Sequence, residues 1–186
     1  MLAAASEVQR FFKRHKWQFC IIGGLAVLRW GEPRTTQDVD VSLLTGFRGE
    51  EKFVDAILEQ FVPRMDDARQ FALTNRVVLC RASNGVTLDI VLAGWPFEER
   101  AIRRASAYRF APRVSLVTAS AEDMIVMKAF AGREMDWRDI RGIVETQPAL
   151  DWRYIEREAK PLLDLKDDLS WLDRLRALRK ERGRDE

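Results

Sequence analysis

Hydrophobic and polar positions along this chain follow two repeats, one typical of strands and the other typical of helices. Short, mostly apolar runs predict strands at Trp17–Ile22, Asp38–Leu44, Arg76–Ala82, Val86–Leu92 and Arg113–Thr118. Helical spacing of apolar residues predicts helices at Ser6–His15, Leu25–Trp30, Glu50–Phe61, Pro96–Ser106, Trp137–Glu145, Asp151–Ala159 and Leu162–Lys180, with one more beginning at Ser120. This mixture of strands and helices predicts an α/β fold.

Turn and capping residues separate these elements. Gly23 and Gly24 directly follow the first strand, where glycine allows either a tight turn or a close approach of the backbone to a ligand. Asn84-Gly85 lies between two strand-like runs and predicts a β-hairpin. Three polar residues are expected to cap helices: Ser6, Ser120 and Asp136. Two polar segments are expected to be loops: residues 31–37 and 64–71.

Length and composition fit one domain, or a core domain with a helical extension. Of the 186 residues, 47% are apolar, which is enough for a core and too many for a disordered chain. We expect an α/β core over residues 1–118 and a helical C-terminal portion over residues 119–186 that packs on it. The formal net charge of +2 does not indicate a strongly basic, partner-binding protein, although local basic patches are compatible with it.

The chain shows no pattern of export or membrane insertion. Its first residues lack the basic-then-apolar order of a signal peptide, and no apolar run approaches the length of a membrane span. Cys20 and Cys80 lie in apolar, strand-like runs and are expected to be small core residues rather than a disulfide framework. These features predict a cytoplasmic protein.

Three aspartates have the placement of a metal site. Asp38 and Asp40 are two positions apart in a predicted strand, so both side chains point to one face. Like charges held this close repel unless a cation lies between them, and Mg²⁺ bound by carboxylates and substrate phosphates is the usual solution. Asp89 lies inside an apolar strand, where a carboxylate is costly unless it is paired or binds a cation. The alternatives are strand-edge charges in water for the pair, and an ion pair with Arg34 or Arg81 for Asp89.

Several cations have both a structural and a functional interpretation. Lys128 lies in a mostly apolar helix, where it either extends to solvent or contacts a phosphate. Arg34 and Thr36 either meet a phosphate, orient the carboxylates or belong to a loop surface. His15 is expected to be an ordinary solvated residue at a helix C-terminus. The basic face of Arg100, Arg103 and Arg104 is either solvated or contacts RNA or phosphate.

The order Gly-Gly, Asp-Val-Asp and a later strand aspartate resembles the nucleotidyltransferase superfamily typified by DNA polymerase beta. The longer stretch IIGGLAVLRWGEPRTTQDVDVSLL looks more narrowly like the AbiEii/AbiGii toxin-type nucleotidyltransferases, and DMIVMKAFAGREMDWRDI is similar to their downstream motif. The resemblance covers about residues 20–145. The matching positions are Gly23, Gly24, Arg34, Thr36, Asp38, Asp40, Asp89, Lys128, Arg133, Asp136 and Asp139. One position departs from the pattern: many members have Ser or Thr after the glycines, and here Leu25 follows them.

This resemblance implies an α/β fold with a small mixed sheet, flanking helices and a helical C-terminal portion. It also implies transfer of a nucleotide from an NTP to an acceptor hydroxyl, with release of pyrophosphate. Asp38, Asp40 and Asp89 would bind Mg²⁺, two ions in the usual arrangement. Nucleotide-binding residues would be Gly23, Gly24, Arg34, Thr36, Lys128 and Arg133. Asp136 and Asp139 would either orient these cations or hold the helices together.

The acceptor has several alternatives. The toxin-type resemblance implies transfer to tRNA or another RNA by a toxin that a cognate antitoxin protein counters. A second alternative is an antitoxin-like enzyme that transfers a nucleotide to a partner protein (AMPylation), and a third is transfer to a small antibiotic. A non-catalytic nucleotide-binding or protein-binding module is the alternative from another class. Leu25 favours that module, whereas the presence of all three acids favours an enzyme.

Overall fold

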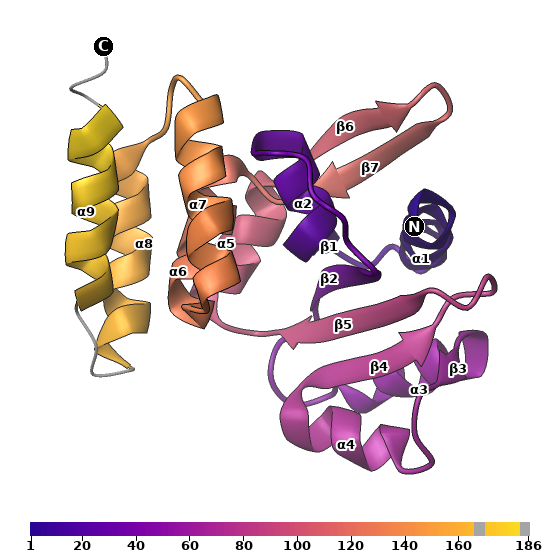
Figure 1. Ribbon diagram of the computed structural model, residues 1–186. Coiled ribbons are helices and arrows are strands. Elements are labelled where there is room, and N and C mark those ends of the chain that lie inside the picture. Colours follow the sequence, from indigo (N-terminus) through magenta and orange to yellow (C-terminus); the bar gives the residue numbers. More distant parts are fainter. Residues whose placement is uncertain (166–169, 183–186) are drawn as a thin grey trace. The chain divides into compact units, whose positions relative to one another are not determined.

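The computed structural model describes residues 1–165 and 170–182 and divides into two compact units. Unit 1 comprises Met1–Ala26 and Thr35–Ala119, and unit 2 comprises Val27–Arg34 and Ser120–Glu186. The strands shown in Figure 1 all belong to unit 1. Helix α2 (Gly23–Trp30) begins in unit 1 and ends in unit 2. No pattern in the sequence grouped residues 27–34 with the C-terminal helices.

A seven-stranded mixed sheet forms unit 1 across the part of the chain that is described. Its strands are β1 (Phe19–Ile21), β2 (Asp38–Leu44), β3 (Val62–Pro63), β4 (Val77–Arg81), β5 (Thr87–Ala93), β6 (Ser106–Ala111) and β7 (Val114–Thr118). They lie in the order β3-β4-β5-β2-β1-β7-β6. The pairs β2/β5 and β1/β7 are parallel, and the other neighbours are antiparallel. The expected α/β fold with a mixed sheet is confirmed.

The two faces of the central strands differ in polarity because side chains alternate along each strand. Apolar positions of β2 and β5 face the core and are buried: Val39, Val41, Leu43, Leu88, Ile90 and Leu92. The intervening positions include Asp38, Asp40 and Asp89, and these are half-buried. The acids therefore lie on the face opposite the apolar core of these strands.

Four helices complete unit 1: α1 (Leu2–Arg14), α3 (Glu51–Gln60), α4 (Ala68–Asn75) and α5 (Pro96–Arg104). Helices α3 and α4 pack against each other and beside β4, and α5 packs against β1 and β2 (Figure 1). Helix α1 packs against β7, where the buried Gln9 donates to the Ser115 carbonyl and accepts from the Val117 N–H, both at 2.8 Å. These two bonds attach α1 to the backbone of β7.

Unit 2 is helical. Its helices α6 (Ala121–Ala131), α7 (Glu134–Thr146), α8 (Trp152–Asp164) and α9 (Ser170–Arg182) follow one another along the chain. Helix α6 packs on α7 and α8, and α9 packs on α7 and α8. The predicted cap at Ser120 is confirmed, since its Oγ accepts from the Asp123 N–H at 3.2 Å. Gly132 ends α6 in the left-handed conformation (φ +73°), as expected of a helix-ending glycine.

The structure corrects several local expectations. Ser6 is not a cap, because α1 begins at Leu2 and its alanines extend the helix toward the N-terminus. The expected loop 64–71 contains the start of α4, whose short apolar face is visible only once it packs on α3 and β4. Strand β6 was not predicted, because its exposed side chains carry little hydrophobic pattern. Asp136 lies inside the first turn of α7 rather than at its cap.

The C-terminal expectations are corrected in part. Residues 162–180 do not form one continuous helix, because Leu162–Asp164 belong to α8 and α9 begins at Ser170. The middle of that expected helix, residues 166–169, and the last four residues of the chain lie outside the described residues.

Among the described helices, none is long and apolar enough to cross a membrane. Cys20 and Cys80 are both buried and free, as predicted.

Candidate active site

The register of the sheet brings the predicted acids together. In the parallel pair β2/β5, Asp40 is the direct partner of Asp89. On the other side of β2, the Asp40 carbonyl accepts from the Ile22 N–H at 2.9 Å, immediately before Gly23. The third strand aspartate, the Asp-x-Asp strand and the glycine turn are therefore neighbours in one row across the sheet.

Asp38, Asp40 and Asp89 form a compact acidic cluster. Each offers one carboxylate oxygen, and these three oxygens all lie within 4.8 Å of one another. Oxygens bound to one octahedral Mg²⁺ are about 3 Å apart when adjacent and about 4.2 Å apart when opposite, so the three carboxylates would share an ion after drawing closer together. Hard carboxylate oxygens are also the ligands that Mg²⁺ prefers. The three acids fit a divalent cation in both geometry and chemistry.

The glycine turn lies directly against this cluster. Gly23 has a left-handed backbone (φ +60°), and a Cβ at this position would be 1.8 Å from Oδ2 of Asp40. A Cβ on Gly24 would be 2.3 Å from Oγ1 of Thr36. Both glycines are therefore required by close packing, since any side chain would displace Asp40 or Thr36.

Thr36 contacts the first acid of the cluster. Its Oγ1 lies 3.3 Å from both the carbonyl oxygen and Oδ1 of Asp38. A hydroxyl that donates to a carboxylate restricts its rotation, so Thr36 orients Asp38. Leu25, the position at which the sequence departs from the superfamily pattern, is buried in the core.

Asp89 has an ion-pair partner that sequence reasoning missed. Nη1 of Arg64 donates to Oδ1 of Asp89 at 2.6 Å, whereas the suggested partners lie elsewhere. Arg34 pairs with Asp139, and Arg81 donates to the Gly85 carbonyl. Arg64 follows β3, and only the strand order places it near β5; no local sequence signal identifies it.

The surroundings of Asp89 shift the pKa of its carboxyl in opposing directions. Burial raises the pKa of its carboxyl above the ordinary value, and the negative charge of Asp38 acts in the same direction. The Arg64 guanidinium acts against both and lowers the pKa only in part. Without a bound cation, this carboxyl therefore keeps a proton more readily than an ordinary aspartate.

The remaining predicted residues form a second cluster, within unit 2. The buried Lys128 ammonium lies 3.0 Å from Asp136 Oδ1 and 2.6 Å from Asp139 Oδ2. Arg34 Nε donates to Asp139 Oδ1 at 2.9 Å, and Arg133 Nε donates to Asp136 Oδ2 at 2.7 Å. Asp136 and Asp139 therefore pair with cations from α6, from the residue before α7 and from the segment after α2.

Asp136 is the centre of the capping arrangement of α7. Besides its ion pairs, Asp136 occupies the third helical position, and its Oδ2 accepts from the backbone N–H of Arg133 at 3.2 Å. Burial acts to raise the pKa of this carboxyl, but hydrogen bonds from Arg133 and Lys128 outweigh it and hold the pKa below its ordinary value.

The structure thus gathers the predicted site residues into two groups. Gly23, Gly24, Thr36 and the three acids lie together in unit 1, and the other predicted residues, Arg34, Lys128, Arg133, Asp136 and Asp139, lie together in unit 2. The assignment of Lys128 and Arg133 to nucleotide phosphates stays a prediction.

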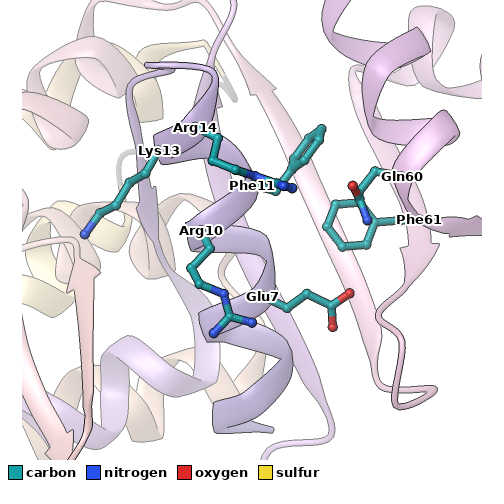
Figure 2. Close-up of a pocket in the computed structure, with 7 residues that line it drawn as sticks. All are labelled: Glu7, Arg10, Phe11, Lys13, Arg14, Gln60 and Phe61. Carbon is teal, nitrogen blue, oxygen red and sulfur yellow. The ribbon is translucent and has the colours of Figure 1, made fainter.

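A separate groove of about 570 Å³ lies along α1 in unit 1. Its lining residues are Glu7, Arg10, Phe11, Lys13, Arg14, Gln60 and Phe61. Figure 2 shows the basic side chains extending from α1, with Phe11 opposite Phe61. The two rings meet edge to face with centroids 5.3 Å apart. The groove contains no residue of the acidic cluster.

Two solved structures have the same fold at low sequence identity. An antigenic nucleotidyltransferase-like protein from Paracoccidioides brasiliensis is 14% identical, with a TM-score of 0.52 over 90% of this chain and 88% of that one. The lincosamide antibiotic adenylyltransferase LnuA, solved with lincomycin bound, is 13% identical, with a TM-score of 0.51 over 78% of this chain and 97% of that one. No curated protein matches the sequence. These similarities confirm a nucleotidyltransferase-like fold.

A comparison with protein-family models identifies the family as well as the fold. A family model described as "Nucleotidyltransferase of unknown function (DUF6036)" matches residues 1–176, which include the glycine turn, the three acids and the charged cluster of unit 2. The nucleotidyltransferase superfamily expected from the motifs is therefore confirmed, while its toxin-type subgroup stays a prediction. The chain belongs to the DUF6036 family of nucleotidyltransferases.

Proposed function

We propose that this enzyme transfers a nucleotide from an NTP to an acceptor hydroxyl, and that Mg²⁺ bound by Asp38, Asp40 and Asp89 is required. The observation that carries the proposal is the convergence of three carboxylates from β2 and β5 beside a glycine turn. When bound, Mg²⁺ neutralises the triphosphate and activates the hydroxyl, and two ions are the usual arrangement for such a displacement.

In this proposal the residues of unit 1 have separate roles. Asp38 and Asp40 hold metal, and Thr36 keeps Asp38 oriented. The acceptor oxygen attacks the α-phosphorus, the bond from phosphorus to the bridging oxygen of the β-phosphate breaks, and pyrophosphate leaves. Asp89 completes the metal site on the acceptor side and takes the hydroxyl proton.

The glycine turn has the properties of a phosphate cradle. Gly23 and Gly24 carry no side chain that would keep a ligand from the backbone, and they begin α2, whose first N–H groups favour an anion. Leu25 offers no hydroxyl to a triphosphate, but the Thr36 hydroxyl lies beside Gly24. These features support nucleotide binding at the turn.

RNA is the acceptor class we propose, with the chain acting as a toxin that a cognate antitoxin counters. The AbiEii-like order of motifs supports this proposal. Arg10, Lys13 and Arg14 on one groove of unit 1 add a positive surface of the kind that contacts nucleic-acid phosphates (Figure 2). A lincosamide-like small molecule is the second candidate acceptor, and the fold shared with LnuA favours it.

The test is a transfer assay with each α-labelled NTP and Mg²⁺, offering tRNA and total RNA, a protein lysate and lincomycin as separate acceptors. We expect label in RNA, and none with Asp40→Ala, whose fold is checked by circular dichroism. Asp55→Ala is the matched control, because Asp55 is an exposed aspartate of α3 paired with Arg69.

Each outcome of this assay discriminates between the alternatives. Label in one lysate protein indicates an AMPylating enzyme, and label in lincomycin indicates a small-molecule acceptor. NTP binding without transfer to any acceptor indicates a non-catalytic module. Growth arrest on expression that disappears with Asp40→Ala supports the toxin, whereas transfer retained by Asp40→Ala refutes the acid cluster as the active site.

A further inference from the structure

Arg64 is held in the row of residues that contains the acids. Its backbone N–H donates to the Leu79 carbonyl at 3.1 Å, and Leu79 is the register partner of Asp89 on β5. Asp89 is in turn the register partner of Asp40. Arg64 therefore reaches over β4 toward the metal-binding face of the sheet, and its Nη1 meets Oδ1 of Asp89 at 2.6 Å.

The ion pair of Arg64 and Asp89 has a short contact distance, but solvent reaches both side chains. A charge-assisted bond of 2.6 Å is short, yet both side chains are about one third exposed, at 30% for Arg64 and 32% for Asp89. Ion pairs with this much solvent access contribute little net free energy, so a competing cation is able to replace the guanidinium. The pair is held by a single contact, from Nη1 of Arg64 to Oδ1 of Asp89, rather than by a bidentate arrangement.

Arg64 and a metal ion compete for the same charge. A guanidinium has no lone pair to offer a metal, and it repels a dication bound to the carboxylate that it contacts. The three carboxylate oxygens lie within 4.8 Å of one another, so an ion shared by them lies close to the Asp89 end of the pair. Arg64 thus occupies the position of a cation in the cluster.

We propose that Arg64 is a built-in counter-cation of the metal site, which a divalent ion displaces from Asp89. This inference rests on the proposed function, in which Asp89 is a metal ligand. Arg64 compensates part of the negative charge of the cluster before metal binds, and it thereby weakens the affinity of the free protein for the ion. Displacement leaves a guanidinium beside the cluster, where an anionic phosphate group can take it as a partner.

The test uses Mn²⁺ as the probe and isothermal titration calorimetry on the full chain as the readout. We expect Arg64→Gln to bind Mn²⁺ about two- to fivefold more tightly than the wild type, which is the range that an exposed ion pair supports. Arg64→Lys retains the positive charge and should remain near the wild-type affinity. Arg69→Gln is the matched control, because it removes an equivalent guanidinium that pairs with Asp55 at 2.7 Å, outside the cluster.

Repeating the substitution in an Asp89→Asn variant tests whether the effect of Arg64 depends on Asp89. In Asp89→Asn the charge that Arg64 compensates is absent, so adding Arg64→Gln should no longer strengthen Mn²⁺ binding. An unchanged affinity of Arg64→Gln in the wild-type background overturns the proposal, and a weaker affinity overturns it and makes Arg64 a positioning residue for Asp89. Circular dichroism of each variant excludes unfolding as the cause.

The outcomes separate this inference from the proposed function. Transfer by the wild type with no gain in Mn²⁺ affinity for Arg64→Gln refutes only the counter-cation. The expected pattern of Mn²⁺ affinities without transfer of any nucleotide refutes only the proposed function. Both are refuted if neither the wild type nor Arg64→Gln binds Mn²⁺ and no nucleotide is transferred.

Discussion

Asp40 and Asp89 are direct register partners on the parallel strands β2 and β5, although they lie far apart in the sequence. A slip of one residue between these strands would turn one of the two acids toward the apolar core. The buried side chains Val39, Val41, Leu88 and Ile90 prevent that slip, so the core of unit 1 fixes the geometry of the acidic cluster.

Gly23→Ala should abolish Mn²⁺ binding and nucleotide transfer. Its Cβ would lie 1.8 Å from Asp40 Oδ2, so the carboxylate must move. Gly85→Ala is a matched control, because Gly85 also has a positive φ (+80°) but has nothing within 4 Å of the added Cβ. Both variants should lose about 1–2 kcal/mol of unfolding free energy from the left-handed backbone, as measured in urea. Wild-type Mn²⁺ affinity in Gly23→Ala would contradict the prediction.

Thr36→Val should weaken Mn²⁺ binding by about two- to tenfold, the range expected for losing one hydrogen bond that orients a ligand. Valine retains the shape of threonine but cannot donate to Asp38. Thr74→Val, on the exposed end of α4, removes a hydroxyl that accepts from Gln70 Nε2 at 3.2 Å and should leave the affinity unchanged. Calorimetric titration measures both, and an equal effect of the two substitutions would argue against an orienting role for Thr36.

Lys128→Met should destabilise the protein by about 3–5 kcal/mol, because it leaves the buried carboxylates of Asp136 and Asp139 without the ammonium that they share. Urea unfolding followed by circular dichroism measures the loss. Lys160→Met changes an exposed lysine of α8 in the same unit and should have little effect. A loss below about 1 kcal/mol for Lys128→Met would show that the ion pairs are not important for folding.

Acid should remove the contribution of Asp136 to stability. Burial opposes the charged form, but the bonds from Arg133 and Lys128 hold the pKa of this carboxyl below its ordinary value of 3.8. A lowered carboxyl pKa stabilises the folded state above the unfolded-state pKa, and this stabilisation is lost as the pH falls through the folded-state pKa. Asp136→Asn should therefore be less stable than the wild type at pH 7, and the difference should shrink below about pH 4.

The control for this pH series is Asp173→Asn, because the Asp173 side chain is 80% exposed on α9. Its unfolding free energy should follow the wild type at each pH. A difference between Asp136→Asn and the wild type that stays constant down to pH 3 would contradict the assignment.

Cys80 should resist alkylation by iodoacetamide at pH 8 in the folded protein. Burial, assisted by the charge of Asp89, raises the pKa of its thiol to about 12, so the reactive thiolate is scarce. Labelling should become rapid in urea, where the thiol is exposed, and its extent is read by mass spectrometry of the Cys80 peptide. Fast labelling without denaturant would show that the strand opens locally.

Local patterns in the sequence were sufficient for several elements. The bounds of β2 are those predicted from its alternating residues, the Asn84-Gly85 turn joins β4 and β5, and Ser120 caps α6. Each of these features depends on interactions between residues close in the chain, namely strand alternation, turn conformation and capping. The same reasoning found the glycine turn and all three acids of the cluster, because each is unusual in its immediate surroundings.

By itself, the sequence determined most of the helices and strands, and it identified the three carboxylates that are expected to bind a metal. Only the tertiary structure decided the partners: Arg64 for Asp89, Asp139 for Arg34, and Asp40 beside Asp89. It also decided that the edge strand β6 forms against β7. The physical reason is the distance along the chain over which each kind of interaction acts. Propensity and periodicity depend on residues that are close in the sequence, whereas strand order and helix packing set the contacts between distant residues. The sequence around an exposed arginine therefore does not indicate which carboxylate it will pair with.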